Sequence, residues 1–156
     1  MVFLIEEMNS KVASNILDWK YDQPYDFYNS KRTEDALEEL LDGSYYAVID
    51  KNNEVIGFFC TGENAQVPVG NHFDVYNDNL IDMGVGMHPN LTGQGKGFEF
   101  CTCIIKFIEE KYDSKSLRLT VATFNDRAVH LYKKLGFVKK DVFTNGITEF
   151  IIMIKM

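Results

Sequence analysis

The most informative stretch of this sequence is a glycine-rich loop at residues 88–98, which reads HPNLTGQGKGF. Gly93, Gly95 and Gly97 stand at alternate positions, directly after an apolar segment and directly before an amphipathic one. Glycines leave the backbone open to a ligand, and their N–H groups, together with the positive end of a following helix, form an anion site. The loop therefore predicts binding of a phosphate-bearing molecule. A plain glycine-rich turn is the alternative that the pattern alone leaves open.

Two common phosphate-binding loops do not fit this spacing. A Walker loop requires Ser or Thr after Gly-Lys and a glycine five residues upstream, whereas Lys96 is followed by Gly97 and Asn90 stands upstream. A dinucleotide fingerprint would require a glycine at Phe98 and would open the first βαβ unit, but this loop lies past the middle of the chain. A nucleotide-binding protein of either kind is therefore disfavoured.

The chain as a whole is typical of one globular domain, and we predict a single domain over residues 1–156. It has 156 residues, of which 46% are hydrophobic and 25% charged, and a net charge of −7. An acidic chain is poorly suited to nonspecific binding of nucleic acid or of an anionic membrane. No apolar run approaches the ~20 residues of a membrane span, and the N-terminus does not read as a signal peptide. Three cysteines without a spaced framework suggest reduced thiols, so we expect a cytoplasmic protein and no metal site.

The loop must be positioned by strands and helices that alternate along the chain. Segments with strand patterns span residues 2–7, 45–50, 54–61, 80–87, 117–121, 137–143 and 147–154. Helical patterns begin at Asn9 or Ser10, at Thr33, at Gly97 and at Asn125 or Asp126. This order predicts an α/β (mixed α+β) fold, with a central mixed sheet of about seven strands flanked by about four helices. Residues 62–79 are expected to form a long polar loop, which in a compact domain is usually functional or mobile.

An aromatic segment between the first two helices has no helical period. It runs from Trp19 to Tyr28 and also contains Tyr21, Tyr25 and two acids. Aromatic faces beside carboxylates suit an ammonium substrate. A satellite hydrophobic cluster that holds the segment down is an equally weighted alternative.

Two motifs resemble those of the GNAT-type, RimI-like N-acetyltransferases, and the similarity covers nearly the whole chain. The glycine loop resembles the family's acetyl-CoA pyrophosphate loop, Q/R-x-x-G-x-G/A, except that Thr92 stands where Arg or Gln is more frequent. Residues 125–137, NDRAVHLYKKLGF, resemble the signature N-x-x-A-x-x-L-Y-x-K-x-G-F. The resemblance implies an enzyme that transfers the acetyl group of acetyl-CoA to a primary amine, without a metal.

The resemblance also implies which residues hold the cofactor. The pyrophosphate would lie on the loop of Thr92, Gly93, Gln94, Gly95, Lys96 and Gly97. The pantetheine arm would pair like an added strand with the backbone of Met83, Val85 and Met87, while Asn125 would hydrogen-bond that arm. For this the sheet must be partly splayed between residues 83–87 and 117–122. Tight packing of Gly84 and Gly86, and a helix cap at Asn125, are the structural alternatives.

Catalytic roles follow from the same comparison. Tyr132 matches the family's acid, and a phenol is still protonated at neutral pH, so it can protonate the leaving thiolate. A half-buried packing role is its alternative. Asp82 is a candidate base for the amine, provided that burial raises the pKa of its carboxyl group. The alternative is that Asp82 pairs with a basic residue or binds substrate. His72 and Asp78 are weaker candidates.

Two kinds of acceptor fit the sequence. An amine-bearing small molecule and a peptide or protein amine both fit, with Trp19, Tyr21, Tyr25 and Tyr28 as the residues expected to bind it. Homodimers are common in the family. A non-catalytic acyl-CoA-binding or regulatory domain on the same fold is the alternative function, because fold does not guarantee chemistry.

Overall fold

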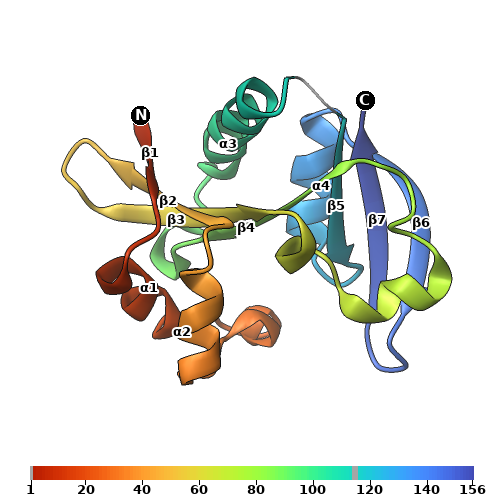
Figure 1. Cartoon of the computed structure of the whole chain (residues 1–156), viewed down its shortest axis with the longest axis horizontal. Helices are drawn as coiled ribbons and strands as arrows, with labels where there is room; N and C mark the ends of the chain where they lie inside the picture. Colours follow the sequence, from red (N-terminus) through yellow and green to blue (C-terminus); the bar gives the residue numbers. More distant parts are fainter. Residues whose placement is uncertain (1, 114–115) are drawn as a thin grey trace. The chain divides into compact units, whose positions relative to one another are not determined.

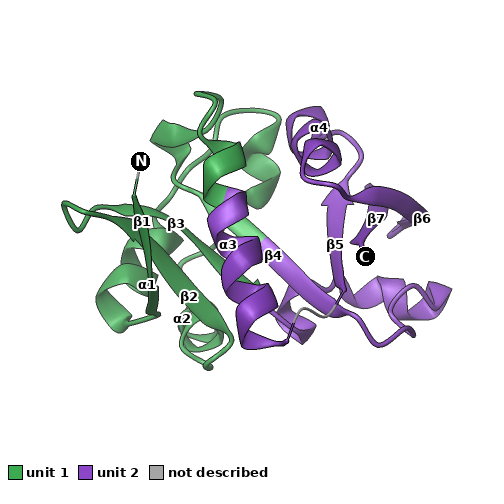
Figure 2. Cartoon of the chain, turned by 90° about the horizontal axis from the view of Figure 1, so that it is seen from above, with its two compact units in different colours: residues 1–60, 85–100 green, residues 61–84, 101–156 purple. Residues whose placement is uncertain are grey.

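The computed structural model describes residues 2–113 and 116–156. The chain divides into two compact units, coloured separately in Figure 2. The first unit comprises residues 1–60 and 85–100, and the second comprises residues 61–84 and 101–156. Two strands and one helix pass from one unit into the other, and each unit is described by itself below. That the chain is a single domain stays a prediction.

The order of elements confirms the mixed fold of seven strands and four α-helices among the described residues (Figure 1). The strands are β1 (Phe3–Glu7), β2 (Tyr45–Asp50), β3 (Val55–Thr61), β4 (Ile81–Met87), β5 (Leu117–Ala122), β6 (Val138–Thr144) and β7 (Glu149–Lys155). The α-helices are α1 (Ser10–Leu17), α2 (Glu34–Leu40), α3 (Gly97–Lys111) and α4 (Asp126–Lys134). Short 3-10 helices are η1 (Tyr25–Tyr28), η2 (Glu63–Ala65), η3 (Pro68–Phe73) and η4 (Pro89–Leu91).

The helices begin where the sequence supplies side-chain caps. The Asn9 side chain accepts a hydrogen bond from the Val12 amide at 2.9 Å, and Thr33 accepts one from the Ala36 amide at 3.1 Å. Each cap satisfies an amide that the first helical turn leaves unpaired. The predicted starts of α1 and α2 are confirmed. No helix among the described residues is long and apolar enough to cross a membrane.

The first unit is built on antiparallel strands. β2 pairs with β1 and with β3, and β4 follows β3 in the strand order. Two glycines allow close packing here. A Cβ atom at Gly57 would overlap the Gly86 carbonyl oxygen and lie 2.5 Å from the Phe100 ring, while one at Gly86 would overlap the Phe58 ring. Tight packing, one of the two roles considered for Gly86, is therefore present.

The second unit combines a parallel and an antiparallel ladder. β4 pairs in parallel with β5, and β7 lies antiparallel between β5 and β6. Figure 2 shows α4 on one side of β5, β7 and β6 and the 62–79 segment on the other. The β4–β5 register consists of Ile81↔Leu117 and Asp82↔Arg118 and extends no further among the described residues. This short ladder agrees with the splayed sheet that the sequence predicts.

The 62–79 segment differs from the long polar loop that the sequence suggests. It contains η2 and η3, and Val75 and Tyr76 are buried in a cluster with Phe143, Phe150 and Ile152. Val75 and Tyr76 stand among polar residues, and two adjacent apolar residues do not produce the periodic hydrophobic pattern from which a buried element is predicted. The segment is consequently a packed layer over one face of the sheet in its unit.

The three cysteines are free thiols, with Cys60 and Cys101 buried. Burial raises the pKa of Cys101 to about 12, so its thiol is protonated at neutral pH and serves packing. Within the described residues, no group of three or more His, Cys, Asp or Glu side chains could hold a metal ion.

Candidate functional site

The glycine-rich loop lies in the first unit between β4 and α3. Gly93 and Gly95 have φ angles of 72° and 77°, in the left-handed region that glycine enters without steric cost. Gly97 begins α3, and the Lys96 carbonyl accepts the first helical hydrogen bond from the Phe100 amide at 3.2 Å. The backbone amides of the loop thus lie directly before the N-terminus of α3, and this arrangement is suited to binding phosphate groups.

Side chains of the loop brace it from within. Thr92 donates through its hydroxyl to the Pro89 carbonyl at 2.9 Å, and Gln94 donates through its side-chain amide to the Asn90 carbonyl at 2.5 Å. The Asn90 amide in turn donates to His88 Nδ1 at 3.1 Å. The position where the family more often has Arg or Gln is therefore occupied by a residue that stabilises the turn.

The aromatic segment divides into two parts. Trp19 packs against His88 with ring centroids 4.9 Å apart, and the Tyr21 hydroxyl donates to the Met87 carbonyl at 2.7 Å. Burial raises the pKa of Tyr21 to about 12, which keeps this hydroxyl a donor. Tyr25 and Tyr28 instead belong to η1, where Tyr28 is 40% exposed. The first part is a cluster against the end of β4, and the second carries the exposed ring of Tyr28.

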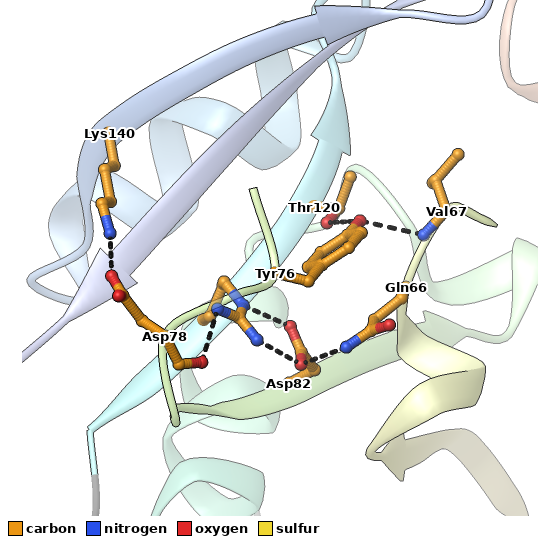
Figure 3. A network of polar contacts seen from close by, with 8 residues as sticks. Gln66, Val67, Tyr76, Asp78, Asp82, Thr120 and Lys140 are labelled. Carbon is orange, nitrogen blue, oxygen red and sulfur yellow. Dashed lines mark hydrogen bonds and ion pairs between the residues drawn. The ribbon is translucent and has the colours of Figure 1, made fainter. Parts of the chain in front are cut away.

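In the second unit, Asp82 and Arg118 form a buried ion pair. Figure 3 labels Asp82 and marks its hydrogen bonds with dashed lines. Arg118 Nε donates to Asp82 Oδ1 and its NH2 group donates to Oδ2, both at 2.7 Å, and the two residues are 2% and 3% exposed. Gln66 donates to Oδ2 at 2.8 Å. The hydrogen bonds with Asp82 raise the pKa of Arg118, which is therefore a permanent cation. Both carboxylate oxygens of Asp82 are engaged, which favours pairing with a basic residue over the role of a base.

The same network includes Tyr76. Its ring lies 5.1 Å from the Arg118 guanidinium carbon, within cation–π range, and its hydroxyl accepts from the Val67 amide at 2.9 Å. The hydroxyl also lies 2.7 Å from the Thr120 hydroxyl. Burial raises the pKa of Tyr76. Arg118, Gln66 and Tyr76 thus join Asp82, although the sequence pointed to Asp82 alone.

The helix that carries the second motif holds two further candidates. Asn125 caps α4 through its side-chain oxygen, which accepts from the Ala128 amide at 3.2 Å. Tyr132 is 9% exposed, and its ring packs edge-on against Phe137 at 5.9 Å. The helix-cap role of Asn125 is confirmed. The cofactor contact of Asn125 and the acid role of Tyr132 stay predictions.

The weaker base candidates have exposed side chains, although the Asp78 carbonyl binds Arg118. His72 is exposed on η3. Asp78 forms an exposed ion pair with Lys140. A signal for the missed partner was present in the sequence, since Asp82 and Arg118 are charged residues inside otherwise apolar strands, and buried charges occur in pairs.

Comparisons with known proteins identify the family of this chain and solved structures that share its fold. The Acetyltransferase (GNAT) family matches residues 13–137. A chimera of spermidine N-acetyltransferase SpeG from Vibrio cholerae and hSSAT has a TM-score of 0.69 and 19% identity, covering 99% of this chain and 95% of that one. A GNAT-family acetyltransferase from Bacillus anthracis has a TM-score of 0.74 and 14% identity, with 99% and 94% covered.

A third solved structure, described as a putative phosphinothricin N-acetyltransferase, has a TM-score of 0.71 and 16% identity, covering 99% of this chain and 98% of that one. None of the curated proteins matches the sequence. Such distant structures show the shared fold, whereas the family match spans most of the chain. The chain therefore belongs to the Acetyltransferase (GNAT) family and is an acyltransferase.

Proposed function

We propose that this enzyme transfers the acetyl group of acetyl-CoA to the nitrogen of a primary amine by direct attack. The observation that carries the proposal is the braced glycine loop at the start of α3, where Gly93 and Gly95 adopt left-handed backbone angles. The pyrophosphate of the donor binds the loop amides, with Thr92, Gln94 and Lys96 bordering them. The RimI-like subtype stays a prediction.

The pantetheine arm is proposed to pair with the backbone of β4 at Met83, Val85 and Met87. The short β4–β5 ladder supports this, because strand amides beyond a ladder need other partners. The Met87 carbonyl already accepts a hydrogen bond from Tyr21, so we expect Met83 and Val85 to contribute most of the pairing. Asn125 is proposed to contact the same arm through its side-chain amide group, since its oxygen caps α4.

In the chemical step the amine nitrogen forms a bond to the thioester carbon, and the carbon–sulfur bond then breaks. We propose that Tyr132 donates its phenolic proton to the departing thiolate, which avoids releasing a free anion. The attacking nitrogen is neutral, whereas other nitrogens of the acceptor can stay cationic. Water takes the proton that this nitrogen loses after attack, and solvent returns a proton to Tyr132. Asp82 is not needed as a base in this scheme, which fits its two engaged oxygens.

The acceptor is proposed to be a cationic amine. The first unit contains thirteen acidic and six basic side chains, so it carries a net charge of −7. Tyr25 and Tyr28 in that unit lie beside Asp22 and Asp26 in the sequence, a combination suited to an ammonium group. Trp19 and Tyr21 contribute by holding the segment down. The spermidine acceptor named for a structural neighbour makes a polyamine the first compound to test.

The proposal is tested by incubating the protein with acetyl-CoA and a panel of polyamines, amino sugars, peptide N-termini and lysine peptides, and detecting released thiol. We expect thiol release that depends on the amine and is strongest with a polycation. Binding of acetyl-CoA without thiol release from any amine would support the non-catalytic alternative, which family membership disfavours. The cytoplasmic location and a homodimer also stay predictions.

A further inference from the structure

The ladder between β4 and β5 ends at a pair of charged residues. Its register consists of Ile81↔Leu117 and Asp82↔Arg118, and the Ile81 amide donates to the Ser116 carbonyl at 3.0 Å. Met83 and Gly84 then continue β4 beyond the last described pair. Asp82 and Arg118 therefore stand at the fork, which we define as the point where β4 leaves β5.

The geometry of the pair makes this fork rigid. The two parallel hydrogen bonds of 2.7 Å fix the guanidinium and carboxylate planes relative to each other. A third donor of Arg118, NH1, reaches the Asp78 carbonyl at 3.1 Å. One guanidinium thus holds the backbone before β4 and the side chain at the end of the ladder.

The 62–79 segment is fastened to the same point. Gln66 donates to Asp82 at 2.8 Å, and the Gly62 amide donates to the Asp82 carbonyl at 2.9 Å. The Arg118 guanidinium carbon lies 5.1 Å from the centre of the Tyr76 ring. Figure 3 shows Gln66 of the segment hydrogen-bonded to Asp82, with the Tyr76 ring nearby.

A strand that contains glycines specifies its register weakly, and β4 contains Gly84 and Gly86. A buried ion pair, by contrast, tolerates no slip, because a displaced charge would be left without a partner. The pair therefore supplies the register that the sequence of β4 does not.

We propose that Asp82 and Arg118 are positioning residues for the acyl donor, because they fix the fork and so present the backbone of β4 that follows it, beginning at Met83, in one register. This inference rests on the proposed function, in which the donor pairs with β4. It assigns Asp82 a role through Arg118 and gives it no proton-transfer step.

The test compares Asp82→Asn, Arg118→Met and the double variant. We expect each single variant to raise the KM for acetyl-CoA roughly tenfold, to change kcat less than about threefold, and to keep the pH profile of kcat. Since each residue acts through the other, the KM for acetyl-CoA of the double variant should be no higher than that of the more impaired single variant.

Tyr76→Phe is the matched control, because it removes a buried hydroxyl of the same network and keeps the Asp82–Arg118 pair. We expect it to lower the melting temperature and to leave the KM for acetyl-CoA unchanged. If Asp82→Asn or Arg118→Met does not fold, Gln66→Leu and Arg118→Lys provide milder changes with the same expected direction.

Hydrogen exchange separates failure of this inference from failure of the proposed function. In the unliganded Asp82→Asn or Gln66→Leu variant, we expect the Ile81 and Gly62 amides to exchange at least about tenfold faster than in Tyr76→Phe. That readout needs no activity, so it holds even if the wild type releases no thiol. Unchanged exchange and an unchanged KM would overturn the inference. Loss of one limb of the pH profile in Asp82→Asn, with Arg118→Met like the wild type, would instead make Asp82 the base.

Discussion

The two compact units use charge in opposite ways. The first carries the whole net charge of −7, with thirteen acidic and six basic side chains, whereas the second has ten of each. Yet the loop proposed to bind a pyrophosphate belongs to the acidic unit. The anion site must therefore be made by local backbone amides and a helix N-terminus, because the field of the whole unit repels phosphate.

The second unit buries two of its charged side chains. Asp82 and Arg118 are buried and paired, and they tie a surface segment to two strands. The first unit instead fastens its aromatic segment with a neutral hydrogen bond from Tyr21 to a strand carbonyl and with ring packing by Trp19. Twelve of the thirteen acidic side chains of the first unit are exposed, which suits a cationic acceptor, while charges of the second unit also serve architecture.

The largest expected effect is a loss of turnover at Tyr132, without a loss of acetyl-CoA binding. Tyr132→Phe should lower turnover by roughly ten- to a thousandfold, because it removes the donor that protonates the thiolate. Stabilisation by acetyl-CoA in a thermal melt should remain, since the loop belongs to the other unit. Tyr112→Phe is the control, because it removes a hydroxyl that contacts Thr61 in the same unit. Equal turnover in Tyr132→Phe and the wild type would leave Tyr132 a packing residue.

The next effect concerns the loop. A ligand present at about 100 times its Kd stabilises a protein by about 2.7 kcal/mol. Acetyl-CoA at such a concentration should raise the free energy of unfolding of the wild type by this amount, which is measured as a shift of the melting temperature. Gly95→Val should abolish the shift, because a branched side chain at φ 77° distorts the amides.

Gly146→Val is matched to that variant. Its φ angle is 95°, and like Gly95 it has open space around an added Cβ atom. It should cost a similar backbone strain and keep the acetyl-CoA shift. A shift lost equally in both variants would assign the effect to general destabilisation.

A smaller effect is expected for the exposed aromatic part. Tyr28→Ala should raise the acceptor KM a few-fold and leave the acetyl-CoA KM alone, because one cation–π contact contributes about 1 kcal/mol. Asp26→Asn should do the same and weaken the salt dependence of acceptor binding. Steady-state kinetics at two salt concentrations measure both. Equal changes for both substrates, together with a lower melting temperature, would make η1 purely structural.

The smallest effect tests an exposed pair in the second unit. A hydrogen bond from Lys140 holds the pKa of Asp78 below its usual value, so the ionised carboxylate favours the folded state. This contribution is present above the unfolded pKa of about 3.9 and disappears as the pH falls through the lower folded pKa.

Asp78→Asn should therefore lower the melting temperature by no more than about 2 °C at neutral pH, since exposed pairs contribute little. The difference from the wild type should vanish well below pH 4. A large, pH-independent loss would instead mean that the substitution disturbs the Asp78 carbonyl, which Arg118 binds.

Local features of the fold were predictable because their causes lie within a few residues. The caps at Asn9, Thr33 and Asn125 act on amides three positions away, and strand bounds agree to within one or two residues. The Asp82–Arg118 pair joins residues 36 positions apart, and its existence depends on the β4–β5 register, which no local pattern encodes. The aromatic segment has no period, so its division between a packed part and an exposed part followed only from the structure.

The paired glycines of the first unit have a consequence for how this sequence can diverge. At Gly86 the three atoms nearest to an added methyl group all belong to the ring of Phe58, so a smaller residue at position 58 would relieve these contacts. At Gly57 the obstacle includes the carbonyl oxygen of Gly86, which every amino acid possesses. A larger residue can therefore replace Gly86 if Phe58 becomes smaller at the same time. No side-chain substitution elsewhere would remove the obstacle at Gly57, so we expect position 57 to stay glycine as the sequence evolves.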